Sequence, residues 1–219
     1  MTETLDPTDR SRLRRMHHLG RFDRATIDAI LDAQPVCSVA NVMDGKPYLT
    51  PTLQWREGDR VYWHGSSASH ALRKGKGCVV CLNVTIVDGY VLARSEFNHS
   101  VNLRSVTLFG LAEVVPDDQK EARMTAMIDG LWPGRSKLLR PILPQELKAT
   151  LILSLLIHEA SAKIRSGPPE DEPDDYVLPI WAGVVPMITK FGRAVPDPRN
   201  LARVAAPQQV IPARSGQKE

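Results

Sequence analysis

Short strand-like segments joined by tight turns, with no long helix between them, restrict the fold of this chain more than any other feature. Val36–Ala40 is followed by the turn pair Asp44-Gly45 and by a second segment from Pro47 to Trp55. A turn at Glu57-Gly58-Asp59 leads into a third segment, Arg60 to His64. Two-residue turns join antiparallel neighbours, whereas parallel strands need crossover connections of a dozen or more residues. The pattern therefore predicts an antiparallel sheet.

The rest of the chain alternates further strands with a few helices. Apolar spacing predicts helices at 22–31, with Asp23 as N-cap, at 68–74, from 116 for about 15 residues, and at 144–150. Strands are expected at 78–83, 90–95, 105–115, 151–159 and 180–186, and Asp88-Gly89 is interpreted as another hairpin turn. Seven or eight short strands favour a small antiparallel barrel with added helices over a sandwich.

Length and composition indicate one globular domain with polar ends. The chain has 219 residues, of which 42% are hydrophobic and 24% charged, enough for a substantial core. We expect an N-terminal arm at 1–15, a folded domain at 16–195 and a C-terminal tail at 196–219. The arm is expected to be mobile or docked on a partner, and the tail carries few core signals.

Charge and hydropathy exclude several classes of protein. The formal net charge is only +3, which does not indicate nucleic-acid binding. No apolar run approaches the roughly 20 residues of a membrane helix, and the polar N-terminus lacks a signal peptide core. A cytoplasmic location without membrane contact is therefore expected. The three cysteines are interpreted as core residues rather than metal ligands, because Cys78 and Cys81 point to opposite faces of a strand.

A hydroxyl-rich turn stands out between the third strand and the basic helix at 68–74. Its sequence is Gly65-Ser66-Ser67-Ala68-Ser69. Backbone N–H groups and hydroxyls in such a turn are suited to holding an anion. We interpret the turn as a phosphate site, with the flanking strands binding what the phosphate is attached to.

Several motifs occur in an order that resembles one protein family. A strand ending in His64-Gly65-Ser66 is followed by Ser69 and a basic helix, then by DGYVLARS at 88–95. Later come HSVNLRSV at 99–106, Phe109-Gly110-x-Ala112 and Pro179-x-Trp181-Ala182-Gly183. Over about residues 20–190 the chain resembles the pyridoxamine 5′-phosphate oxidase-like flavoproteins, the FMN-binding split barrels. It looks closest to the branch that includes nitroimidazole-resistance proteins.

The resemblance implies a fold, a cofactor and an assembly. The fold is mainly β, a six-stranded antiparallel FMN-binding split barrel with peripheral helices. The assembly is a homodimer with FMN at the subunit interface, and an unknown small molecule is the substrate. Carried over by position, the cofactor-binding residues are Thr50, Thr52, His64, Gly65, Ser66, Ser67, Ser69, His70, Arg94, Asn102, Arg104, Ser105 and Trp181.

Within that set, the resemblance gives the residues different tasks. His70 stands where family members often carry Arg or Lys, and a neutral imidazole binds phosphate more weakly than a permanent cation. Arg94 would place positive charge near the pyrimidine end of the flavin ring. Thr50 and Thr52 would make polar contacts with the ring edge. The FMN phosphate would be surrounded by Ser66, Ser67, Ser69 and His70.

The same resemblance favours an FMN-dependent oxidoreductase but leaves alternatives open. The sequence does not single out a His, Glu or Cys as a catalytic acid, base or nucleophile. Apolar residues follow Trp181-Ala182-Gly183, where pyridoxamine phosphate oxidases carry an Arg-x-His pair, so oxidation of that substrate is disfavoured. The alternatives are a non-catalytic flavin-binding protein and a barrel that holds deazaflavin or haem. Haem would need an axial ligand from His64, His70 or His99, and spacing does not single one out.

Overall fold

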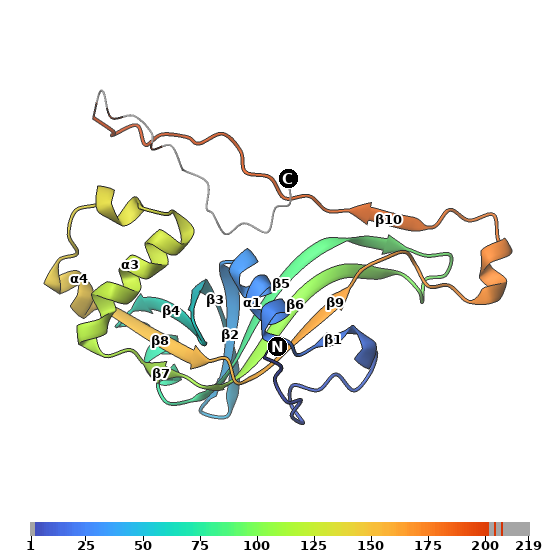
Figure 1. Ribbon diagram of the computed structural model, residues 1–219, viewed down its shortest axis with the longest axis horizontal. Helices are drawn as coiled ribbons and strands as arrows, with labels where there is room; N and C mark the ends of the chain where they lie inside the picture. The colour runs from blue at the N-terminus through green and yellow to red at the C-terminus, as the bar shows by residue number, and fades with distance from the viewer. Residues whose placement is uncertain (1–2, 202–203, 205–206, 208–219) are drawn as a thin grey trace.

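The computed structural model describes residues 3–201, 204 and 207, and its core is an antiparallel sheet with helices at its edges (Figure 1). The helices are α1 (Arg24–Ala33), α2 (His70–Gly75), α3 (Lys120–Leu131) and α4 (Pro144–Ala149). The strands in the described residues are β1 (Gly20–Arg21), β2 (Val36–Met43), β3 (Lys46–Glu57), β4 (Arg60–Ser66), β5 (Val79–Leu92), β6 (Ser100–Leu111), β7 (Glu113–Val114), β8 (Thr150–Leu156), β9 (Glu159–Arg165) and β10 (Gly183–Pro186).

The described strands pair in the order β1-β9-β6-β5-β2-β3-β4-β8-β7, and β10 pairs with β5 outside this path. Every pairing is antiparallel. The sheet curls without closing, with β1 and β7 at its two ends, which confirms the predicted split barrel with peripheral helices. The sheet has more strands than the six that the resemblance implied. The long β5, β6 and β9 carry it beyond the barrel, as Figure 1 shows.

The Asp88-Gly89 pair is not the hairpin turn that its sequence suggested. Strand β5 runs through both residues, and its pairing with β6 shifts register between Val87 and Gly89. A Cβ on Gly89 would lie 2.7 Å from the carbonyl oxygen of Val185. The glycine is therefore needed because β10 approaches closely, and the hairpin turn lies further on, between β5 and β6.

The main core lies between α1 and the inner face of the sheet. Asp23 accepts a hydrogen bond from the backbone N–H of Thr26 at 2.8 Å, so the predicted N-cap is confirmed. The helix buries Ile27, Ile30 and Leu31, each at most 3% exposed. These side chains belong to one apolar cluster with β5 and β6 residues such as Leu82 and Leu108. Burial of this face holds the helix on the sheet.

A second apolar cluster lies under the helical insertion between β7 and β8. Trp55 and Tyr62 stack with ring centroids 5.6 Å apart. Met127 of α3 and Ile152 of β8 are buried in the same cluster. The helix expected from residue 116 begins as a 3-10 turn, Asp117–Gln119, and continues as α3. The single strand expected at 151–159 is two strands, β8 and β9, separated by a turn at Ile157 and His158.

The N-terminal segment lies against the domain rather than apart from it. Leu5 is buried in the main core, and its backbone N–H donates to the carbonyl of Phe22 at 2.9 Å. Arg10 forms an ion pair with Glu159 on β9. From Glu3 onward, the residues assigned to a separate arm at 1–15 thus contact the chain's own domain. Most of the tail expected at 196–219 lies outside the described residues.

Among the described residues, no helix combines the length and the apolar character that crossing a bilayer requires. The cytoplasmic location stays a prediction.

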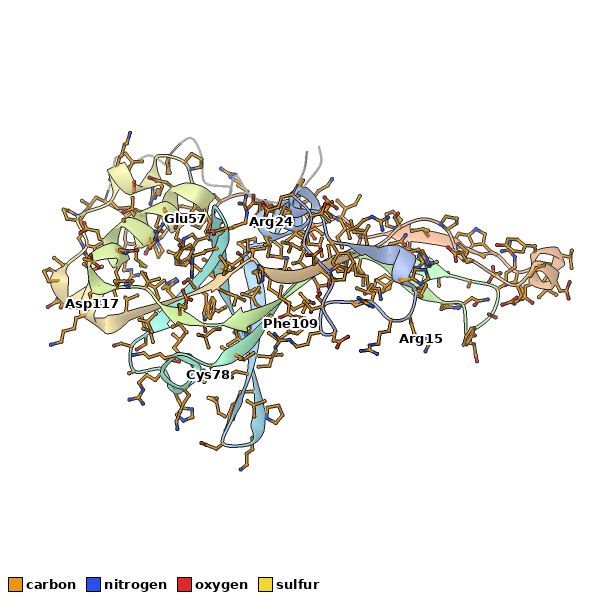
Figure 2. All side chains as sticks on the ribbon, turned by 60° about the horizontal axis from the view of Figure 1, so that its bottom comes forward. Arg15, Arg24, Glu57, Cys78, Phe109 and Asp117 are labelled. Atoms are coloured by element: carbon orange, nitrogen blue, oxygen red, sulfur yellow. The ribbon has the colours of Figure 1, made fainter. Side chains whose placement is uncertain are left out.

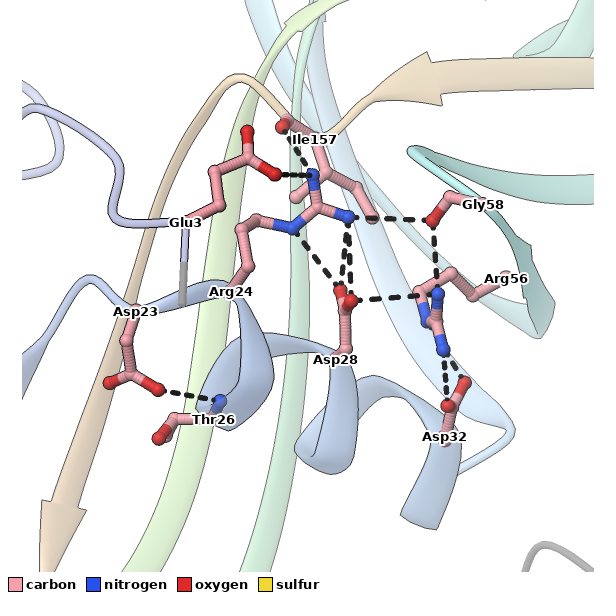
Figure 3. A network of polar contacts seen from close by, with 9 residues as sticks. All are labelled: Glu3, Asp23, Arg24, Thr26, Asp28, Asp32, Arg56, Gly58 and Ile157. Carbon is pink, nitrogen blue, oxygen red and sulfur yellow. Dashed lines mark hydrogen bonds and ion pairs between the residues drawn. The ribbon is translucent and has the colours of Figure 1, made fainter. Parts of the chain in front are cut away.

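A buried arginine ties α1 to two turns of the sheet (Figure 3). Arg24 is 9% exposed, donates to the carbonyls of Ile157 and Gly58 at 3.4 Å, and pairs with Asp28 at 3.2 Å. Arg56 joins the same network through Asp28. The guanidinium therefore satisfies the buried carbonyl of Ile157, whereas the exposed Gly58 carbonyl also accepts from Arg56 at 2.9 Å.

We expect Arg24→Met to lower the free energy of unfolding by about 1–3 kcal/mol, because it leaves the buried carbonyl of Ile157 unpaired while keeping the apolar stem. The matched control is Arg14→Met, whose side chain is 75% exposed and lies 3.7 Å from Asp9. An exposed pair of this kind contributes at most about 1 kcal/mol. Urea unfolding of both variants measures the difference, and equal effects would contradict the role of Arg24.

Candidate functional site

A cavity of about 160 Å³ lies between α2 and the strands β2, β3, β4, β5 and β8. Its walls are mainly apolar, with hydroxyl, amide and imidazole groups on one side. We call this cavity and its rim the α2 groove. Its lining residues are Val39, Asn41, Thr50, Thr52, Trp63, His64, Gly65, Ser66, Ser69, Ala71, Leu72, Gly75, Val80 and Leu153.

The hairpin of β2 and β3 supplies one wall of the groove. The turn at Asp44-Gly45 is closed by Met43 opposite Lys46, which aligns Val39 with Thr50. Residues directly opposite each other in an antiparallel pair point to the same face of the sheet. Val39 and Thr50 therefore both face the groove, and Thr52 follows two residues along the same face.

The hydroxyl turn forms the rim where β4 passes into α2. Ser69 is the N-cap of α2, and its hydroxyl oxygen accepts from the backbone N–H of Leu72 at 3.4 Å. The Ser66 hydroxyl oxygen accepts from the backbone N–H of Ala68 at 3.1 Å. Each hydroxyl still has its own proton to donate. Two of the predicted phosphate ligands thus shape the turn and retain one donor each.

His64 is the titratable residue of β4 beside the groove, and because side chains alternate along the strand its ring lies on the opposite face from Trp63. Its Nδ1 is buried and has no hydrogen-bond partner. The ring meets Trp55 edge-on, with centroids 5.9 Å apart. Burial lowers the pKa of His64 below its ordinary value, because the apolar surroundings disfavour the charged ring. A neutral imidazole with an unsatisfied nitrogen is suited to binding a metal centre or accepting a proton.

Gly65 lets α2 lie close to the sheet. A Cβ at this position would lie 2.6 Å from Cδ1 of Leu72, one of the groove residues. Any larger side chain would therefore push Leu72 from its place.

The structure brings together six of the thirteen predicted site residues and leaves seven outside the cavity. Those lining it are Thr50, Thr52, His64, Gly65, Ser66 and Ser69. Ser67 is exposed on the turn, and the exposed His70 lies at the rim with its ring 6.4 Å from that of Tyr48. The others lie on the β5–β6 extension or before β10: Arg94, Asn102, Arg104, Ser105 and Trp181.

Three residues of the extension already have protein partners in the same chain. Arg94 pairs with Asp171 at 2.8 Å, and Arg104 pairs with Asp88 at 2.7 Å. Asn102 donates to the carbonyl of Gly167 at 3.0 Å and accepts from Arg165. In the described chain, Arg94 and Asn102 therefore hold the segment after β9, through Asp171 and Gly167, while the Arg104–Asp88 pair joins β6 to β5.

The lining residues of the groove that sequence reasoning missed include three apolar side chains and one amide. Asn41, Trp63, Val80 and Leu153 line it from four different strands. The Asp44-Gly45 turn contained a signal for part of this set, because a two-residue hairpin determines which β2 residues face Thr50 and Thr52. No comparable signal exists for Leu153, which reaches the groove through the long-range pairing of β8 with β4.

The fold and the groove define a class: an antiparallel split barrel with a mainly apolar groove beside a hydroxyl turn. Residues 23–164 match the family described as pyridoxamine 5′-phosphate oxidase. The chain belongs to this family. No curated protein is significantly similar in sequence.

Two solved structures are similar over nearly the whole chain. The flavocytochrome Anf3 from Azotobacter vinelandii is 46% identical, with a TM-score of 0.90, covering 93% of this chain and 96% of its own. The FAD and heme binding protein from Mycobacterium smegmatis is 39% identical, with a TM-score of 0.84, covering 87% and 94%. A candidate 5-nitroimidazole resistance protein from Bacteroides thetaiotaomicron is 16% identical, with a TM-score of 0.53 over 65% and 84%, and shares the fold.

We expect the lowered pKa of His64 to give the cofactor-free protein a measurable pH dependence. As pH falls below about 6.5, His64 takes up a proton in the unfolded chain before it does so in the folded chain. The folded state therefore loses stability progressively until the pH is below the folded pKa of His64. His64→Phe should flatten the dependence of the unfolding free energy on pH by up to about 1.4 kcal/mol per pH unit in that window. Urea unfolding between pH 7.5 and 5 measures it, and unchanged slopes would contradict the burial of the ring.

Proposed function

We propose that this protein is a flavocytochrome that binds both a flavin and a haem. The observation that carries the proposal is the α2 groove, a mainly apolar cavity bordered by His64 of β4 and by His70 at the start of α2. Support comes from the two full-length relatives, one named as a flavocytochrome and the other as an FAD and heme binding protein.

We assign the groove to the haem. The sequence placed a flavin there, but two histidines border the cavity and its walls are mainly apolar. A haem needs an axial protein ligand and an apolar slot, whereas a flavin needs no such ligand. His64 in the wall and His70 at the rim are the two imidazoles that border the groove. His99, the third candidate, is exposed, and its Nδ1 contacts the carbonyl of Ser95 at 2.8 Å.

The residues around the groove suit this assignment. Trp63, Leu72 and Leu153 exclude water from the apolar part of the slot. Gly65 allows α2 to cover it, and Ser66 and Ser69 offer hydroxyl donors to carboxylates at its mouth. A flavin exchanges one or two electrons and a haem one, so a chain that holds both is suited to oxidoreductase chemistry with a small acceptor.

The flavin of this proposal is FAD rather than the FMN expected from the sequence, because the Mycobacterium smegmatis relative is named for FAD. We place it between two copies of the chain, in a homodimer. Apolar side chains such as Leu49 and Trp181 are 65% and 69% exposed in the single chain, which supports burial by another copy.

An absorbance spectrum of the purified protein tests the two cofactors together. We expect flavin bands and a haem Soret band, with sharpened visible bands after reduction by dithionite. Mass analysis of the released cofactors should give FAD and haem. Release of FMN would support the original expectation from the sequence, and a protein without haem would refute the flavocytochrome.

Histidine variants locate the haem. We expect either His64→Ala or His70→Ala to lose at least about 90% of the Soret absorbance while keeping its flavin, because loss of an axial ligand removes the main protein bond to the iron. His99→Ala is the matched control and should keep both cofactors. If a groove variant lost flavin and kept haem, the groove would be the flavin site that the sequence predicted.

A further inference from the structure

The segment after β10 leaves the sheet beyond Met187, whose backbone N–H still donates to the carbonyl of Asp88 at 3.0 Å. Residues 187–201, which we call the C-terminal arm, form neither helix nor strand, and each of them is exposed. Figure 1 shows the arm continuing from β10 along one side of the molecule. Large apolar side chains recur along it: Met187 is 42% exposed, Ile188 72%, Phe191 45% and Val195 90%. A solvated loop does not need these residues, whereas a segment that packs on another surface does.

The total surface of the chain points to a missing contact. The accessible surface is 14321 Å², whereas a compact monomer of 24.3 kDa exposes about 10000 Å². The residues outside the description account for at most about 3000 Å² of the difference, even if fully extended. The remaining excess of about 1300 Å² is larger than the roughly 800 Å² that each partner buries in a standard interface.

A second exposed apolar surface lies on the outward face of the sheet. Val36 and Val42 of β2 point outward beside Leu49 of β3, since Ala40 pairs with Leu49 in register. Val79 of β5 pairs with Leu111 of β6 on the same face. These five side chains are between 51% and 65% exposed. Phe109 of β6 (Figure 2) lies on this face and carries Arg10 over its ring.

We propose that the C-terminal arm of each copy packs on the outward sheet face of a second copy of the chain. In a two-fold dimer, such an exchange buries both arms and both faces at once, because the contact is self-complementary. The arm is exposed in the single chain, so its apolar residues lack this cover when one copy is alone. The inference rests on the homodimer of the proposed function and adds the element that holds it together.

The first test weakens the apolar side of the arm. Ile188→Ser, Phe191→Ser and Val195→Ser together should raise the dimer dissociation constant at least tenfold in sedimentation velocity. The matched control is Lys190→Ser with Arg193→Ser, which changes the same arm without removing apolar surface and should leave the constant within about twofold. An unchanged constant in the apolar variant would overturn the arm exchange.

The second test asks which chain the arm touches. A photo-crosslinking amino acid replaces Phe191 in a tagged copy, which is mixed with an untagged wild-type copy. We expect crosslinks between the two copies, in peptides that contain β2, β3, β5 or β6. Crosslinks within one chain, or to another surface of the partner, would overturn the proposal.

The outcomes separate this inference from the proposed function. If the apolar arm variant dimerises as the wild type does, the proposed arm contact is refuted and the homodimer is not. A wild-type protein that stays monomeric at every concentration refutes both. Cofactor content, measured on the same samples, tests the flavocytochrome independently of either result.

Discussion

The pairing of β5 with three other strands is the constraint on which the rest of the structure depends. Over Val80–Asn83, β5 pairs with β2 on one side and β6 on the other, and Val80 lines the α2 groove. Over Gly89–Leu92 the place of β2 is taken by β10, while the pairing with β6 continues. One strand thus belongs to the barrel at its beginning and to the extension at its end. The groove and the C-terminal arm are therefore positioned by the same ladder of hydrogen bonds.

Local signals in the sequence were sufficient to predict the barrel, which contains the beginning of β5. Two-residue turns, an N-cap at Asp23 and the apolar face of α1 each act within a few residues of the chain, and each was recognised. The hydroxyl turn was recognised as an anion site from its own composition, whereas His64, Thr50 and Thr52 were carried over by position from the family resemblance. Six predicted residues accordingly meet in one cavity.

Contacts between distant parts of the chain could not be derived in this way. Asp88-Gly89 has the composition of a turn, yet its glycine serves β10, which lies almost one hundred residues later. Arg94 looked free to approach a cofactor, but its partner Asp171 lies 77 residues away, with a side chain that is 0% exposed. Local composition does not distinguish an arginine that is available to bind a ligand from one that is paired with a loop of its own chain. That distinction depends on the folded topology.

The groove and the outward face show how one hairpin can serve two purposes. Because side chains alternate along a strand, Val39 faces the groove while Ala40 and Val42 face outward. A ligand in the groove therefore contacts one face of β2, and a subunit on the outward face contacts the other. In the single chain, the inner side of β2 borders the cavity and the outer side leaves Val42 largely exposed. If the proposed assembly forms, cofactor binding and subunit contact stabilise the same two strands, and each should strengthen the other.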